Sequence, residues 1–158
     1  MGIKILRCDD RLIHGQCIVR ILNDYQIDHI ILVDSFTATN PVMKQIYKMA
    51  VPQSIAIDTL APADAVDVIE AASTADDNTL VLVKDPIVAL ELVKATDALP
   101  RELNIGPMSN RLETSKKTFY SYLLPGEETA CDGLTDLGVR VYFQQVPGEK
   151  EIEWAEVR

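Results

Sequence analysis

Short apolar runs alternate with helical patterns along the whole chain, and this alternation limits the fold more than any other feature of the sequence. The runs are rich in β-branched residues and nearly free of polar ones, which is typical of strands that are buried on both faces. We predict strands over residues 3–8, 29–34, 54–58 and 79–83, and weaker ones over 103–106 and 139–143.

The segments between these runs have the spacing and the boundary residues of helices. Asn40-Pro41 and Asp85-Pro86 each combine an N-cap residue with a proline at the first helical position. Gly138 marks the end of the last helix. We predict helices over residues 16–23, 41–49, 62–72, 87–94 and 127–137, whereas the polar segment 109–121 fits neither pattern clearly.

Repeated strand–helix alternation predicts a parallel sheet with helices on both faces. A chain of 158 residues without a repeat, a low-complexity tract or a linker suits one domain over residues 1–158. No apolar run approaches the roughly 18 residues that span a bilayer. The net charge of -9, with Lys116-Lys117 as the one adjacent basic pair, argues against nucleic acid as a partner.

The cysteines and histidines favour no metal or disulfide framework. Cys8, Cys17 and Cys131 are an odd number without CxxC spacing, and we expect all three to be reduced packing residues. With His14 and His29 as the two histidines, a zinc site is not expected. No Walker or Rossmann glycine motif occurs, and we therefore expect no bound cofactor.

Residues 9–16 concentrate reactive side chains where the first strand passes into the first helix. In an open parallel sheet, ligands bind beyond the carboxyl ends of the strands, which is where this loop lies. The loop holds the carboxylates Asp9 and Asp10, the guanidinium of Arg11 and the imidazole of His14, followed by Gly15. The helix that starts here would direct free N–H groups at any anion bound in the loop.

These residue types suit reversible phosphoryl transfer. A neutral imidazole such as His14 both attacks phosphorus and leaves it readily. Arg11 offers a planar fork of donors for phosphate oxygens, and Asp10 is placed either to hold Arg11 or to orient the imidazole. The plainer alternative is a solvated turn with a surface histidine and a weak ion pair, and the residues by themselves leave both interpretations open.

Residues 10–16, with the sequence DRLIHGQ, resemble the signature of the IIB components of the mannose/sorbose family of the bacterial sugar phosphotransferase system (PTS). Segments 31–34, 48–52, 104–106 and 139–147 resemble further family segments in the same order. The resemblance implies a three-layer α/β/α fold with a mainly parallel, open twisted sheet of about six or seven strands, in which the first strand is central.

The resemblance also implies a function. His14 would accept a phosphoryl group on Nδ1 from a histidine of a IIA protein and pass it to a sugar bound by the membrane IIC and IID components. Arg11 would support the phosphoryl group. Such a protein is a cytoplasmic phosphotransferase, peripherally associated with its permease. Mannose, fructose, sorbose and amino sugars are all compatible with this resemblance.

Other polar residues at the same edge complete the predicted site. We expect Gly15, Gln16, Lys84 and Gly106 to lie near the phosphoryl group, and Asp85 to act mainly as an N-cap. We expect His29, which opens the second strand, to be structural. Trp154 is expected to anchor the C-terminal segment on the domain.

The chain departs from the family pattern in two places, and one other function stays open. Cys17-Ile18 follows Gln16 where the family often continues with valine and soon a tryptophan, and Pro107 replaces a common glycine. These positions affect the surface that partners contact. The alternative function is a regulatory module that senses phosphorylation without passing phosphate to sugar.

Overall fold

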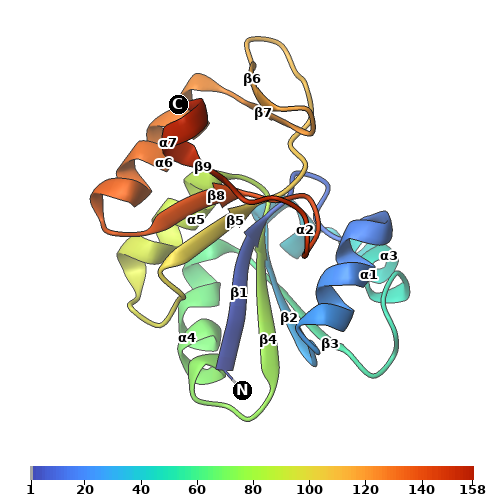
Figure 1. The fold of residues 1–158 in the computed structure, drawn as a ribbon. Helices are drawn as coiled ribbons and strands as arrows, with labels where there is room; N and C mark the ends of the chain where they lie inside the picture. Colours follow the sequence, from blue (N-terminus) through green and yellow to red (C-terminus); the bar gives the residue numbers. More distant parts are fainter. Residues whose placement is uncertain (1) are drawn as a thin grey trace.

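The computed structural model describes residues 2–158, which form a seven-stranded sheet in the order β3-β2-β4-β1-β5-β8-β9 (Figure 1). β9 pairs antiparallel with β8, and the other six strands run parallel. The strands are β1 (Gly2–Cys8), β2 (His29–Val33), β3 (Ala56–Leu60), β4 (Asn78–Val83), β5 (Glu102–Ile105), β8 (Arg140–Phe143) and β9 (Ile152–Glu153).

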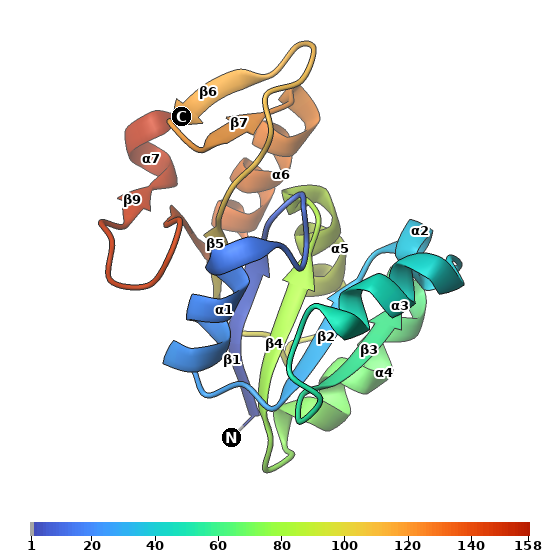
Figure 2. The same cartoon turned by 90° about the vertical axis from the view of Figure 1, so that its right-hand side faces the viewer.

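Helices cover both faces of this sheet, which confirms the predicted three-layer α/β/α architecture. α1 and α3 lie on one face, and α4, α5 and α6 lie on the other (Figures 1 and 2). The helices are α1 (Gly15–Asp24), α2 (Ser35–Ala38), α3 (Pro41–Met49), α4 (Pro62–Ser73), α5 (Pro86–Ala95), α6 (Pro125–Asp136) and α7 (Trp154–Val157).

The apolar runs of the sequence are strands with two buried faces. In β4, Leu80 and Leu82 pack in the cluster that includes the buried residues of α1. Val81 and Val83 pack on the opposite face, with the buried residues of α4 and α5. Successive side chains therefore enter different hydrophobic cores, and neither face of the strand tolerates a polar run.

The predicted caps are confirmed, but two elements, β3 and α6, begin two residues away from their predicted starts. Asn40 Oδ1 accepts the Met43 N–H at 3.1 Å, and Asp85 Oδ1 accepts the Val88 N–H at 3.0 Å. The strand predicted over 54–58 is β3, Ala56–Leu60, because the Ile55 N–H donates to the Pro52 carbonyl in a preceding turn. α6 starts at Pro125 instead of residue 127 because the chain already turns there, with proline at its first position.

Several short elements were not predicted. The ambiguous segment 109–121 contributes to an antiparallel hairpin of β6 (Ser115–Thr118) and β7 (Ser121–Leu123). α2, α7 and β9 span two to four residues each, which is too short for a periodic pattern. The prediction for Trp154 is confirmed: its side chain is buried and its Nε1–H donates to Asp132 Oδ1 at 2.9 Å.

β1 is central in the sheet, between β4 and β5, as the resemblance implied. The carboxyl ends of these three strands are in register, since Cys8 pairs with both Val83 and Ile105. The loops that follow them meet at one edge, and the β6–β7 hairpin stands beyond that edge (Figures 1 and 2). Within residues 2–158, no helix has the length and apolar character that crossing a bilayer requires.

Candidate active site

The loop after β1 is a tight turn held by its own backbone and by Asp9. The Asp9 N–H donates to the Val83 carbonyl at 3.0 Å, and the Leu12 N–H donates to the Asp9 carbonyl at 2.9 Å. Asp9 Oδ1 accepts the Arg11 N–H at 2.9 Å. Leu12 adopts a left-handed conformation (φ 57°), and its side chain and that of Ile13 are buried. The turn thereby leaves Arg11 and His14 on the surface.

His14 occupies the N-cap position of α1 with an exposed side chain. Its imidazole makes no hydrogen bond or ion pair with any of residues 2–158. The first turn of α1 contains no acidic side chain, so the positive end of the helix is not compensated. Gly15 has φ 61°, and a Cβ there would meet nothing within 4 Å, which shows that glycine is needed for the backbone angle. Gln16 is exposed in the same turn.

Asp9 is a buried carboxylate between two arginines. Its side chain is 3% exposed, and its oxygens lie 4.0 Å from Arg7 Nη2 and 3.9 Å from Arg11 Nε. Burial raises the pKa of Asp9, while the hydrogen bond from the Arg11 N–H and the charges of Arg7 and Arg11 oppose that rise. Asp9 therefore fixes the backbone of Arg11 and lies beside its guanidinium.

Arg7, on β1, was not predicted as a site residue. Its guanidinium is buried and donates to Asn104 Oδ1 at 2.5 Å and to the carbonyls of Gln144 and Gln145 at 3.1 and 2.7 Å. Burial lowers the pKa of Arg7, and the neighbouring Asp9 opposes this. The signal in the sequence was a second charged residue, besides Lys4, inside a strand whose other residues are apolar or glycine. The loop after β1, residues 9–14, is here called the active loop. Arg7 links the start of this loop to the segment that follows β8.

Asp10 has a different partner from the one predicted. Instead of contacting Arg11 or the imidazole, its carboxylate accepts the Ser109 N–H at 2.6 Å and the Ser109 hydroxyl at 3.2 Å. The Asp10 N–H donates to the Pro107 carbonyl at 3.2 Å. The reason is topological, because the loop after β5 lies directly beside the loop after β1. Asp10 thus joins the loop after β1 to the loop after β5.

Two of the predicted neighbours of the phosphoryl group, Lys84 and Gly106, lie in the loops after β4 and β5. The Gly106 N–H donates to the Cys8 carbonyl at 2.8 Å, and the Gly106 carbonyl accepts the Ser121 hydroxyl at 2.6 Å. Its N–H is therefore not available to a ligand. Lys84 lies exposed after β4, with no ion pair to any of residues 2–158.

A shallow pocket of about 270 Å³ adjoins Arg11. It lies between the loop after β1, the loop after β5, the β6–β7 hairpin and the segment after β8. Its lining combines a guanidinium, a hydroxyl, amides and two aromatic rings, from Arg11, Pro107, Met108, Ser109, Asn110, Tyr120, Tyr122 and Gln145. An anionic group bound at Arg11 thus has polar side chains from three parts of the chain around it.

The remaining candidates lie outside this site. His29 Nε2 lies 2.7 Å from Asp58 Oδ2, at the edge of the sheet opposite to the loop, which supports a structural role. Cys8 and Cys131 are buried free thiols, and burial raises the pKa of both, that of Cys131 to about 12. Cys17 is half-buried in α1. Among residues 2–158, no three His, Cys, Asp or Glu side chains are grouped to hold a metal ion.

The sequence and the structure are similar to those of IIB proteins over nearly the whole chain. The model of the family described as PTS system sorbose subfamily IIB component matches residues 3–157. The PTS system sorbose-specific EIIB component of Lacticaseibacillus casei is 31% identical over 146 residues, which cover 92% of this chain and 88% of the relative. The PTS system fructose-specific EIIB component of Bacillus subtilis (strain 168) is 22% identical over 159 residues, covering 99% and 96%.

Solved structures agree with these matches. The IIBSor domain of the sorbose permease from Klebsiella pneumoniae superposes with a TM-score of 0.90 at 25% identity, covering 99% of this chain and 95% of that one. The manxB structure from Thermoanaerobacter tengcongensis gives 0.86 at 26% identity, covering 98% and 93%. Together with the family match from residue 3 to residue 157, they show that the protein belongs to the sorbose subfamily of IIB components, the phosphocarrier domains of the sugar phosphotransferase system.

Proposed function

We propose that this protein accepts a phosphoryl group on His14 from a IIA protein and transfers it to a sugar held by membrane IIC and IID components. A transferase role and partners of these general kinds follow from the family. One observation carries the assignment to His14: its imidazole is exposed, unpartnered within residues 2–158 and placed at the N-terminus of α1, in the same loop as Arg11.

Each of the two transfers exchanges one bond to phosphorus for another. In the first, an imidazole nitrogen of His14, assigned as Nδ1 by resemblance, attacks the phosphorus of phosphohistidine on IIA. The bond to the donor nitrogen breaks as the new P–N bond forms, and the electron pair returns to the donor imidazole. In the second, a sugar hydroxyl oxygen attacks the same phosphorus, the bond to His14 breaks, and the hydroxyl proton passes to the released imidazole.

The surroundings of His14 supply charge stabilisation for both steps. Arg11 Nε lies beside Asp9, and within residues 2–158 the guanidinium has no other partner, which leaves its remaining donors for phosphoryl oxygens. The uncompensated N-terminus of α1 favours the phosphorylated form by about 0.3–1 kcal/mol if the group stays exposed. Phosphoryl transfer asks a protein mainly for such positioning and charge stabilisation.

The proposed acceptor is a hexose or an amino sugar, and the proposed location is the cytoplasmic side of a membrane permease. Relatives named for sorbose, fructose and N-acetylgalactosamine support this range of acceptors. The exposed His14 loop supports an exchange between protein partners, since both the donor histidine and the sugar must reach one atom.

The test follows labelled phosphate from a phosphorylated IIA protein of the same organism onto this chain. A phosphoramidate on imidazole is lost in acid and kept in alkali, whereas serine and threonine esters behave in the opposite way. We expect the wild type to take an acid-labile label, His14→Ala to take none and His29→Ala to take it normally. A label on His14→Ala, or one that survives acid, would refute the phosphohistidine. A labelled wild type that never passes phosphate to sugar on permease membranes would favour the regulatory module.

A further inference from the structure

Glu127 is a buried carboxylate outside the active loop. It lies in the first turn of α6 with its side chain 3% exposed. Its Oε1 accepts the Leu124 N–H at 2.8 Å and Arg111 Nη2 at 2.9 Å, and its Oε2 accepts Arg111 Nη1 at 3.3 Å. The Arg111 side chain is 36% exposed, so the pair costs desolvation mainly of the Glu127 carboxylate, and water weakens the attraction between the two charges. Stability alone is therefore a poor explanation for this pair.

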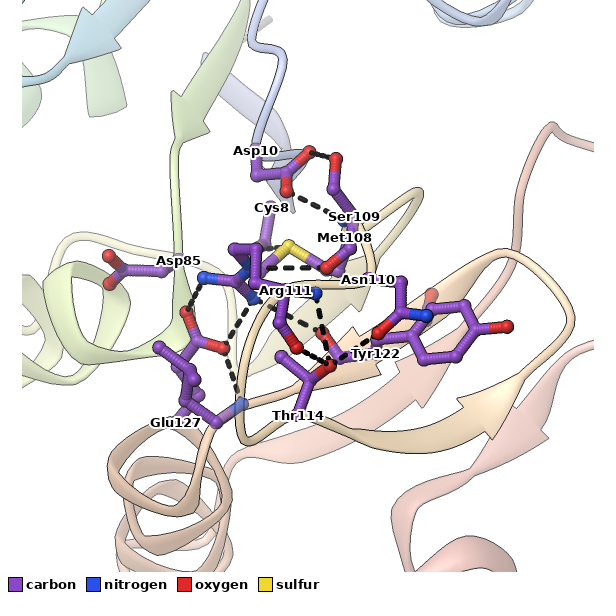
Figure 3. A network of polar contacts seen from close by, with 12 residues as sticks. Cys8, Asp10, Asp85, Met108, Ser109, Asn110, Arg111, Thr114, Tyr122 and Glu127 are labelled. Carbon is purple, nitrogen blue, oxygen red and sulfur yellow. Dashed lines mark hydrogen bonds and ion pairs between the residues drawn. The ribbon is translucent and has the colours of Figure 1, made fainter.

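Arg111 joins three segments of the chain (Figure 3). Besides Glu127, its guanidinium donates from Nε to the Ser109 carbonyl at 3.1 Å and from Nη2 to the Tyr122 carbonyl at 3.2 Å. The hydrogen bond to Glu127 raises the pKa of Arg111 further above its usual value. The loop after β5, strand β7 and the start of α6 are thus held by one side chain.

The segment that Arg111 holds is bonded in turn to the active loop. Ser109, whose carbonyl Arg111 binds, donates its N–H and its hydroxyl to the two carboxylate oxygens of Asp10 (Figure 3). Three residues separate Asp10 from His14, and two of them, Leu12 and Ile13, are buried in the core. A hydrogen bond from the Leu12 N–H to the Asp9 carbonyl closes the turn that contains Asp10 and Arg11. A displacement of Asp10 therefore moves a short and tightly packed loop.

We propose that Arg111 and Glu127 are positioning residues for phosphoryl transfer, and that the chain of contacts Glu127–Arg111–Ser109–Asp10, here called the Arg111 brace, holds the His14 loop in place. The inference rests on the proposed function of His14. In-line transfer depends on the position of the attacking nitrogen, and a displacement of about 1 Å costs up to about 100-fold in rate.

The test compares Glu127→Gln with wild type in transfer from phosphorylated IIA. Glutamine keeps an oxygen that accepts the Leu124 N–H but loses the charge that binds Arg111. We expect kcat to fall on the order of ten- to a hundred-fold, with KM for IIA within about two-fold, because the docking surface is unchanged. The matched control is Glu153→Gln, which weakens the Arg140–Glu153 ion pair on β8 and β9 and should transfer at the wild-type rate.

A double-mutant cycle separates positioning from a general loss of stability. If Glu127 acts through Asp10, the rate effects of Glu127→Gln and of Asp10→Ala, which removes both acceptors of Ser109, should be less than multiplicative in the double variant. Arg111→Lys, which keeps the charge and loses the fork, replaces Glu127→Gln if that variant does not fold, and the same fall in kcat is expected. The brace would be overturned if Glu127→Gln lowered thermal stability but kept the wild-type kcat. It would also be overturned if the rate effects of the two single variants were fully multiplicative in the double variant.

The proposed function of His14 and the Arg111 brace are refuted by different results. An unlabelled wild type would overturn the proposed function and the brace with it. A wild type that is labelled on His14, together with a Glu127→Gln variant as fast as Glu153→Gln, would overturn only the brace.

Discussion

The guanidinium of Arg7 occupies the space that a side chain at position 106 would need. A Cβ on Gly106 would lie 2.7 Å from Arg7 Cζ, closer than real Cβ contacts come. Arg7 has little freedom to move away, because it is buried and bonded to Asn104 and to the carbonyls after β8. Gly106 is thus required for the close approach of β5 to a buried arginine on β1.

Gly106→Ala should therefore lower the free energy of unfolding by about 1–3 kcal/mol, the usual cost of overpacking a core. Urea denaturation monitored by the fluorescence of Trp154 measures this change. Gly126→Ala is the control, since the nearest atom to its Cβ would be Ile87 Cδ1 at 3.7 Å, an ordinary contact. The explanation is wrong if both variants have the same stability as wild type.

Arg11→Lys should fold normally and transfer phosphate on the order of ten- to a thousand-fold more slowly. Lysine keeps the charge but loses the planar fork that binds two phosphoryl oxygens, and loss of one charge-stabilising group has effects of this size. Single-turnover transfer from phosphorylated IIA gives the rate. Arg101→Lys, at the opposite edge of the sheet, is the matched control and should transfer normally. An unchanged rate in Arg11→Lys removes Arg11 from the site.

Asp9→Asn should change how stability depends on pH. Because burial raises the pKa of Asp9 in the folded protein above its usual value of 3.8, the folded state binds this proton more tightly than the unfolded chain does. The contribution of Asp9 to stability is therefore full below about pH 3.8 and is lost as the pH rises through the folded-state pKa.

Asparagine does not titrate, so the stability of Asp9→Asn relative to wild type should increase over that pH range. Urea midpoints at a series of pH values give this difference, in which the contributions of all other carboxylates cancel. A relative stability of Asp9→Asn that decreases with pH would contradict the assigned direction.

The native thiols should react very differently with alkylating agents. With a pKa of about 12, Cys131 is thiolate to about one part in ten thousand at pH 8, and Cys8 is fully buried. Only the half-buried Cys17 should be labelled in the folded protein, and all three in urea. Mass spectrometry after iodoacetamide treatment counts the labels. Cys17→Ala should abolish native labelling and retain transfer, and rapid labelling of Cys8 in the native state would show that the first strand opens.

The sequence by itself determined the architecture and the reactive loop. Strands buried on both faces must be apolar throughout, so the layer order could be predicted from local composition. The N-cap residues Asn40 and Asp85 could also be predicted, because the side chain of an N-cap residue accepts a backbone N–H three residues away. The position of His14 and Arg11 at the carboxyl edge of β1 followed from the same local reasoning and from the family signature.

The tertiary structure decided which side chains act together. Asp10 contacts Ser109, 99 positions away, and Arg7 contacts Asn104, 97 positions away, and no periodic pattern in the sequence encodes such pairs. The start of β3 depended on its register with β2, and the β6–β7 hairpin lacked an apolar repeat. Local propensity and hydrophobic period are properties of neighbouring residues, whereas the partners of a charged side chain depend on which strands lie side by side.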